Sequence, residues 1–132
     1  MLDKTRESFS KLKKALDTLE RIVQLPPDPL RVNIDAAIQR FEYTIELYWK
    51  ALKRLLGELG REVTYPKEVL KEAYMGKLIH DEQIWIKMLE DRNNCSHTYN
   101  EDLANEIYSR IRGQYFSIML DTYKTLFQKY NT

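Results

Sequence analysis

The sequence lacks the features that mark disulfide-stabilised, membrane-spanning or metal-binding proteins. A single cysteine, Cys95, excludes an intramolecular disulfide and is typical of a reducing compartment. No stretch approaches the roughly 18–20 uninterrupted apolar residues of a membrane span, and the charged start of the chain has no apolar signal-peptide core. The two histidines form no His-x-x-x-His or cysteine pattern that would predict a metal site. We therefore expect a cytoplasmic protein with no membrane segment, no metal and no cofactor.

Glycine is also scarce, and neither positive nor negative charge is in clear excess. With four glycines the chain has no Gly-rich phosphate loop and no Gly-x-Ser-x-Gly sequence, so a nucleotide-cradling or serine-hydrolase site lacks support. The 21 basic residues are balanced by 20 acidic ones, which argues against a protein that coats nucleic acid but leaves a local basic site open. The length of 132 residues, 43% apolar and 31% charged, predicts one soluble globular domain over residues 1–132.

What the sequence does contain is apolar residues at helical spacing. Over residues 2–23 they recur at alternating steps of three and four, which predicts a helix that ends at the prolines of segment 26–29. The same alternation predicts a longer second helix over about residues 31–59, with Gly60 as its C-cap.

Three further helices follow from start signals. Pro66 suits the first turn of a short third helix, and Asp81 is a natural N-cap for a fourth. Asn100 can cap a long last helix, whose apolar residues fall on two separate stripes. One stripe can serve the core, and the second implies a central helix or an oligomer interface. With no strand signal, we predict an all-α protein, an antiparallel bundle of four to five helices.

The strongest candidate for a catalytic site is one polar segment, residues 92–99, between the fourth and the last predicted helix. Its Arg92 carries a guanidinium that can grip a phosphate, and its His97 carries an imidazole suited to proton transfer. Residues five apart on an unbroken α-helix are about 140° apart. A helix that ends near Arg92 would instead present both side chains at one end of the bundle, with His97 and Tyr99 on the turn.

The spacing of Arg92 and His97 is weak evidence by itself. In a chain with nine arginines and two histidines it arises easily by accident, so on spacing alone a solvated loop between helices is the better explanation of the segment. Cys95 has no motif of a nucleophile and is interpreted as a partly buried spectator. His80 is interpreted as an exposed residue near a helix end.

Two stretches together resemble one family of small HEPN-domain proteins. The first is the run Ile38-Gln39-Arg40-Phe41-Glu42-Tyr43-Thr44-Ile45-Glu46-Leu47-Tyr48-Trp49-Lys50. The second is Gly76-Lys77-Leu78-Ile79-His80-Asp81, followed in the same order by Trp85, Met88-Leu89, Arg92-Asn93 and His97-Thr98-Tyr99-Asn100. The chain is similar, over about residues 5–130, to nucleotidyltransferase substrate-binding proteins and HepT-like toxins of the HEPN–MNT toxin–antitoxin modules.

This resemblance implies a metal-independent ribonuclease toxin, an RNA endonuclease. Its site would comprise Arg92 and His97 as catalytic residues and Asn93 in support, near a homodimer interface. The partner implied is a minimal nucleotidyltransferase (MNT) antitoxin that adds AMP to the motif tyrosine, Tyr99 (AMPylation). The substrate implied is RNA, with transfer RNA as the candidate.

Two other functions stay open. The chain would serve as a non-catalytic substrate- or nucleotide-binding subunit of a two-component nucleotidyltransferase if it cleaves no RNA. It would be a purely structural helical dimer if segment 92–99 takes part in neither activity.

Overall fold

The fold is a bundle of helices in a computed structural model that describes residues 1–131, and those residues contain no strand. The α-helices are α1 (Asp3–Val23), α2 (Val32–Glu58), α3 (Pro66–Met75), α4 (Glu82–Asn93), α5 (Glu101–Arg110) and α6 (Phe116–Tyr130). A 3-10 turn (Cys95–His97) separates α4 from α5, and a π-helical turn (Ile111–Tyr115) joins α5 to α6. The all-α prediction is confirmed. None of the helices described has the length and apolar content needed to cross a bilayer.

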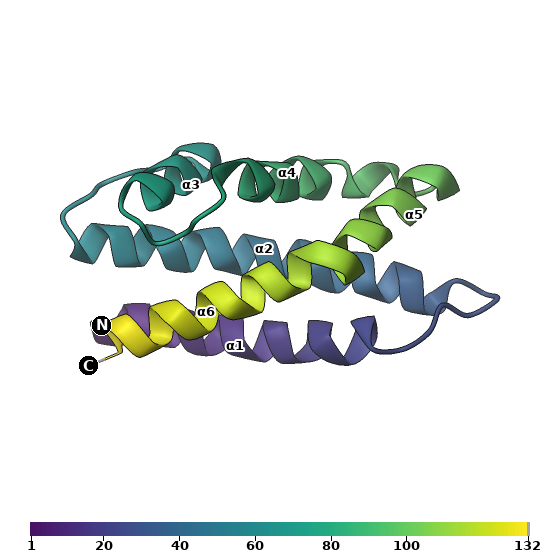
Figure 1. Cartoon of the computed structure of the whole chain (residues 1–132), viewed down its shortest axis with the longest axis horizontal. Helices are drawn as coiled ribbons and strands as arrows, with labels where there is room; N and C mark the ends of the chain where they lie inside the picture. The colour runs from purple at the N-terminus through teal and green to yellow at the C-terminus, as the bar shows by residue number, and fades with distance from the viewer. Residues whose placement is uncertain (132) are drawn as a thin grey trace.

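The long α2 is the centre of the bundle. It contacts α1, α3, α4 and α5. Figure 1 shows α1 running antiparallel along one side of α2, while α3 and α4 lie along the opposite side. The α5–α6 rod crosses obliquely and returns to the end where α1 begins, so the amino group of Met1 donates to the carbonyl oxygen of Tyr130 at 3.0 Å. The turn between α4 and α5 therefore lies at the opposite end of the molecule (Figure 1).

The predicted N-caps are confirmed, and the predicted C-cap is off by one residue. The C-cap of α2 is Leu59, and Gly60 follows it with a φ of +82°, a left-handed conformation that glycine adopts without steric cost. The carboxylate of Asp81 accepts a hydrogen bond from the amide of Ile84 at 3.2 Å, and the side chain of Asn100 accepts one from Leu103 at 3.2 Å. The first cap begins α4 and the second begins α5, so segment 92–99 covers the end of α4 and the turn before α5.

The core is one contiguous cluster of buried side chains drawn from all six α-helices. Its largest fully buried members are aromatic, and the ring of Tyr48 meets that of Trp85 edge-on with centroids 4.7 Å apart. Burying one such large side chain contributes roughly 1.5–3 kcal/mol. Tyr48 also donates its hydroxyl to the carbonyl oxygen of Met119 at 2.7 Å, and burial raises its pKa well above the ordinary value. Tyr48 of α2 thus packs against α4 through its ring and is held to α6 by a hydrogen bond from its hydroxyl.

The C-terminal half differs from the prediction of one long helix with two separate apolar stripes. In the π-helical turn the amide of Phe116 bonds to the carbonyl oxygen of Ile111, five residues back instead of four. The wider turn changes the phase of the helix, so Tyr115, Met119 and Tyr123 all continue one buried face. The prediction assumed a constant period of 3.6 residues, which fails at this turn.

Candidate functional site

Arg92 lies in the last turn of α4 with its guanidinium directed at α2. Its Nη2 is 2.5 Å from Oε2 of Glu46, and its Nη1 donates to the side-chain oxygen of Asn93 at 3.0 Å. The Arg92 side chain is about one-third exposed, at 32%. Arg92 and Asn93, both predicted as site residues, therefore lie together and open to solvent on one side.

Glu46 is a site residue that the sequence reasoning missed. Besides Arg92, its carboxylate accepts a hydrogen bond from the indole nitrogen of Trp49 at 3.0 Å, and it lies 3.5 Å from the ammonium of Lys50. Two of these three partners follow Glu46 on the same helix, at the spacing of side-chain neighbours. That local pattern was readable, but the pairing with Arg92 joins residues 46 apart and left no signal in the sequence.

Two adjoining hollows form a groove between α2 and the motif segment, named here the motif groove. The first has a volume of about 390 Å³ and is lined by Arg92 and by Gln39, Arg40, Glu42, Tyr43 and Glu46 of α2. The second has a volume of about 360 Å³ and is lined by Asp35, Ile38, Gln39 and Glu42 of α2 and by Cys95, Thr98 and Tyr99. Gln39 and Glu42 belong to both hollows, so the groove passes from Arg92 to Tyr99.

His97 and Tyr99 project from the turn that follows α4. His97 ends the 3-10 turn and is exposed, and Tyr99 is 84% exposed. Their rings meet edge-on with centroids 6.1 Å apart. The structure therefore brings His97 and Tyr99 together, as expected of residues on one turn. Within residues 1–131 no hydrogen bond joins Arg92 to His97, and His97 does not line the motif groove.

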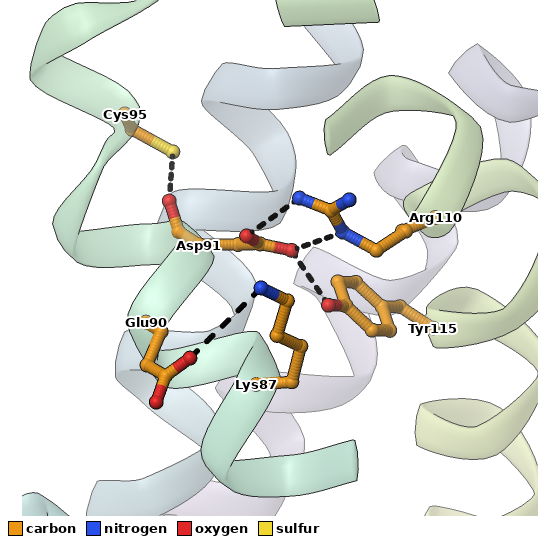
Figure 2. A network of polar contacts seen from close by, with 6 residues as sticks. All are labelled: Lys87, Glu90, Asp91, Cys95, Arg110 and Tyr115. Atoms are coloured by element: carbon orange, nitrogen blue, oxygen red, sulfur yellow. Dashed lines mark hydrogen bonds and ion pairs between the residues drawn. The ribbon is translucent and has the colours of Figure 1, made fainter. Parts of the chain in front are cut away.

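Asp91, the residue before Arg92, is the second one missed. Figure 2 shows its carboxylate directed at the side chains of Arg110 and Tyr115, across from α4. The side chain is 1% exposed, and it accepts from Nε and Nη2 of Arg110 at 2.7 and 2.8 Å and from the hydroxyl of Tyr115 at 2.6 Å. An acid three residues after Met88, on the apolar face of α4, was a readable sign of a buried carboxylate that needs a partner.

The environment of this network shifts the pKa of its members. Burial, and then the hydrogen bond to Asp91, raise the pKa of Tyr115. The hydrogen bond to Asp91 raises the pKa of Arg110, so both donors keep their protons. The Sγ of Cys95 donates to the backbone oxygen of Asp91 at 3.3 Å, and burial raises the pKa of this thiol to about 12. A protonated buried thiol is a poor nucleophile, in agreement with the interpretation of Cys95 as a spectator.

The site thus offers a cation, an imidazole and a phenol on one rim of the bundle. Residues 1–131 contain no cluster of three or more histidine, cysteine or carboxylate side chains that could share a metal ion. His80, the other histidine, is exposed just before α4, at the opposite end of that helix from His97. The chemistry available at this end of the bundle is electrostatic binding of an anion by Arg92 in the motif groove and proton transfer by His97 on the exposed turn outside it.

Comparisons with known proteins agree with this architecture. Residues 7–128 match the family described as "Nucleotidyltransferase substrate binding protein like". The probable ribonuclease HepT of Haemophilus influenzae is 36% identical over 83 residues, which cover 59% of this chain and 57% of that protein. The chain thus spans little more than half of that relative. A crystal structure of a Thermus thermophilus protein is 41% identical with a TM-score of 0.81, over 87% of this chain and 98% of the other.

Proposed function

The chain belongs to the nucleotidyltransferase substrate binding protein-like family of HepT-like HEPN proteins, and from that premise we propose that it is a metal-independent ribonuclease toxin. One observation carries the proposal: Arg92 and His97 leave the same end of α4, Arg92 beside an open groove and His97 exposed on the following turn. A negatively charged strand can reach both groups without any rearrangement of the core.

The proposed reaction is transfer of the phosphodiester to the neighbouring 2′-hydroxyl of RNA. The 2′-oxygen attacks phosphorus as its proton passes to an imidazole, and the bond from phosphorus to the 5′-oxygen breaks as that oxygen takes up a proton. The products are a 2′,3′-cyclic phosphate and a free 5′-hydroxyl. Arg92 stabilises the extra negative charge on the phosphorane, for which it must exchange the Glu46 carboxylate for phosphate oxygens.

A homodimer completes the proposed site. One histidine per chain at the motif supplies either the base or the acid, and a second copy related by a two-fold axis supplies the other. The exposed position of His97 allows it to face a second copy of itself across such an interface. Asn93, through its contact with Nη1, supports the orientation of the Arg92 guanidinium.

Control by a minimal nucleotidyltransferase antitoxin is the proposed regulation. The Tyr99 oxygen attacks the α-phosphorus of ATP, a phosphate ester forms, and pyrophosphate leaves while the phenolic proton passes to solvent. With 84% of Tyr99 exposed, the transferase can reach it without unfolding the segment. Because Tyr99 lines the motif groove and its ring lies beside His97, the attached AMP adds bulk and negative charge at the site.

The decisive experiment is digestion of a transfer RNA pool by the purified chain in the presence of a chelator. We expect cleavage by the wild type and at least a 100-fold loss in Arg92→Ala and in His97→Ala. His80→Ala is the matched control, since it removes the other exposed histidine and should keep full activity. Equal cleavage by folded His97→Ala and wild type would refute the assignment. Mass spectrometry of Tyr99 after co-expression with the transferase tests the regulation: no AMP adduct under an active transferase counts against it.

A second candidate is a non-catalytic subunit that presents a substrate or nucleotide to the transferase. It is favoured by the engagement of Arg92 with Glu46, which occupies the Arg92 guanidinium in the unbound chain. This candidate predicts no RNA cleavage at any protein concentration together with a stable complex with the transferase, so the same digestion separates the two functions.

A further inference from the structure

A separate hollow lies away from the motif segment and its groove, between the first half of α1 and the second half of α2. Its volume is about 870 Å³, more than twice that of either part of the motif groove. None of segment 92–99 lines it. We name it the basic groove after the side chains that line it, which include Lys4, Lys11, Lys50, Lys53 and Arg54.

The charge of the basic groove is out of proportion to that of the chain. Five basic residues line it against three acidic ones, Asp3, Glu58 and Glu62, although the whole chain has a net charge of only +1. Within residues 1–131 the charged ends of Lys4, Lys53 and Arg54 form no ion pair. Glu58 accepts a hydrogen bond from the amide of Leu2 at 2.6 Å, which leaves its negative charge in place, and its Oε2 has no hydrogen-bond partner within residues 1–131. The three cations without an ion pair still outnumber Glu58 and Glu62, so the groove favours an anionic occupant.

Trp49 adds an aromatic surface to the same groove. Its side chain is half-buried, and its orientation is fixed by the hydrogen bond from the indole nitrogen to Glu46 at 3.0 Å. The ammonium of Lys50 lies 5.9 Å from the ring centroid. An immobilised aromatic ring among flexible cations is the arrangement by which proteins bind single-stranded nucleic acid, with bases on the ring and phosphates on the cations.

The basic groove and the motif groove share no lining residue, but they lie on either side of Glu46, which lines the motif groove and bonds to Trp49 of the basic groove. The same Oε2 of Glu46 contacts Arg92 on one side and Trp49 on the other. Lys53 lies seven residues beyond Glu46 on the same face of α2, about 10 Å away at 1.5 Å per residue, and Arg54 is the next residue of the helix. A strand held at Arg92 that follows α2 toward its C-terminus therefore reaches Trp49 and then Lys53 and Arg54 within a few nucleotides.

From this geometry we propose that the basic groove is an exosite for single-stranded RNA, which holds the part of the substrate that flanks the cleaved phosphodiester. Lys53 and Arg54 bind backbone phosphates, and Trp49 stacks on a base. The choice of RNA as the ligand of the basic groove rests on the proposed ribonuclease function. It assigns the groove to RNA and not to an acidic surface of the transferase partner.

The test uses the full chain with His97→Ala, which removes cleavage while RNA binding is measured. A fluorescent single-stranded 12-nucleotide RNA is titrated by polarisation at several salt concentrations. We expect Lys53→Gln with Arg54→Gln to weaken binding about 10-fold, and to reduce the slope of log affinity against log salt by about 0.7 for each phosphate that is no longer bound. Trp49→Ala should weaken binding about 10-fold with an unchanged slope, and Trp49→Phe should restore most of the affinity.

The matched control is Lys67→Gln with Lys71→Gln, two exposed cations on α3 that line neither groove. In the catalytically intact chain, the Lys53 and Arg54 double variant should raise KM for the 12-nucleotide RNA and leave kcat unchanged. If the Lys53 and Arg54 double variant binds RNA as tightly as the control variant does, the exosite is refuted, whether or not the wild type cleaves RNA. Loss of transferase binding with intact RNA affinity also refutes it, in favour of a protein occupant. If the wild type cleaves nothing but RNA binding still depends on Lys53 and Arg54, the exosite holds and the proposed ribonuclease function fails.

Discussion

Asp91 and Arg92 are neighbours in the chain, yet their charges are used in opposite ways. The Asp91 carboxylate is 1% exposed and has three hydrogen bonds from two partners of the α5–α6 rod. The Arg92 guanidinium is 32% exposed and faces Glu46 at the rim of a groove. A carboxylate as buried as that of Asp91 depends on its partners because it has little access to water, whereas a pair in which both side chains are partly solvated exchanges partners easily. The first holds the end of α4 in place, and the second leaves a cation available to a ligand.

The largest expected effect comes from breaking the buried side. Asp91→Ala leaves the guanidinium of Arg110, whose side chain is 28% exposed, and the buried hydroxyl of Tyr115 without their acceptor, and should lower the free energy of unfolding by about 2–3 kcal/mol. Denaturant unfolding followed by circular dichroism measures this loss. Glu46→Ala is the matched control on the exposed side, with an expected loss of at most about 1 kcal/mol. Similar losses for the two variants would show that the two ion pairs do not differ as proposed.

Tyr115→Phe removes one hydrogen bond of the Asp91 network and keeps the ring in the core. We expect a loss of about 1.5 kcal/mol, because the carboxylate keeps its two bonds from Arg110 and loses only the hydroxyl. The same unfolding experiment measures it. Tyr43→Phe, which removes an exposed hydroxyl on the groove side, should change stability by less than about 0.5 kcal/mol. A larger effect at Tyr43 than at Tyr115 contradicts this prediction.

Alkaline pH should weaken the fold through groups that burial keeps protonated. The pKa of Cys95 is raised from 9.0 to about 12, so the unfolded chain loses this proton near pH 9 while the folded chain retains it. Stability is then complete below pH 9 and falls as pH rises from 9 to about 12, by up to about 1.4 kcal/mol for each pH unit. Tyr48 and Tyr115, whose pKa values are also raised, add to the fall above pH 10.

Unfolding measured at pH 8, 9 and 10 tests this dependence, with Cys95→Ala as the control that removes the thiol. The variant should lose less stability than the wild type between pH 9 and pH 10. Identical slopes for the two proteins would mean that the thiol contributes nothing to the alkaline loss.

The smallest change in stability is expected for Glu46→Gln, which sharpens the comparison from the exposed side. Glutamine can still accept from Trp49 but has no charge to hold Arg92, so stability should change by less than about 0.5 kcal/mol. The freed guanidinium should bind single-stranded RNA about 3-fold more tightly in the His97→Ala background. Unchanged or weaker RNA binding would show that Glu46 does not compete with the ligand for Arg92.

The sequence was a good guide to local structure and a poor guide to pairing between helices. Helical spacing and the caps Gly60, Asp81 and Asn100 predicted where helices begin and end, because these signals depend on near neighbours in the chain. They also predicted that Arg92 and His97 would leave one end of a helix. Glu46 escaped prediction because its contact with Arg92 depends on how α2 and α4 pack. The roles of Arg92, His97 and Tyr99 stay predictions from the family resemblance.

The π-helical turn decides what the buried carboxylate can bind. Arg110 and Tyr115 are five residues apart, a spacing that would direct them about 140° apart on a regular α-helix. The wider turn places the fifth residue almost above the first, and so both donors meet the single carboxylate of Asp91. If all residues of segment 111–115 were kept but wound as a regular α-helix, one donor would turn away from Asp91. Deleting one of them would instead leave the two donors four residues apart, about 40° in projection, and so still on one face. The attachment of α4 to the α5–α6 rod therefore depends on how this turn is wound as much as on the identity of its residues.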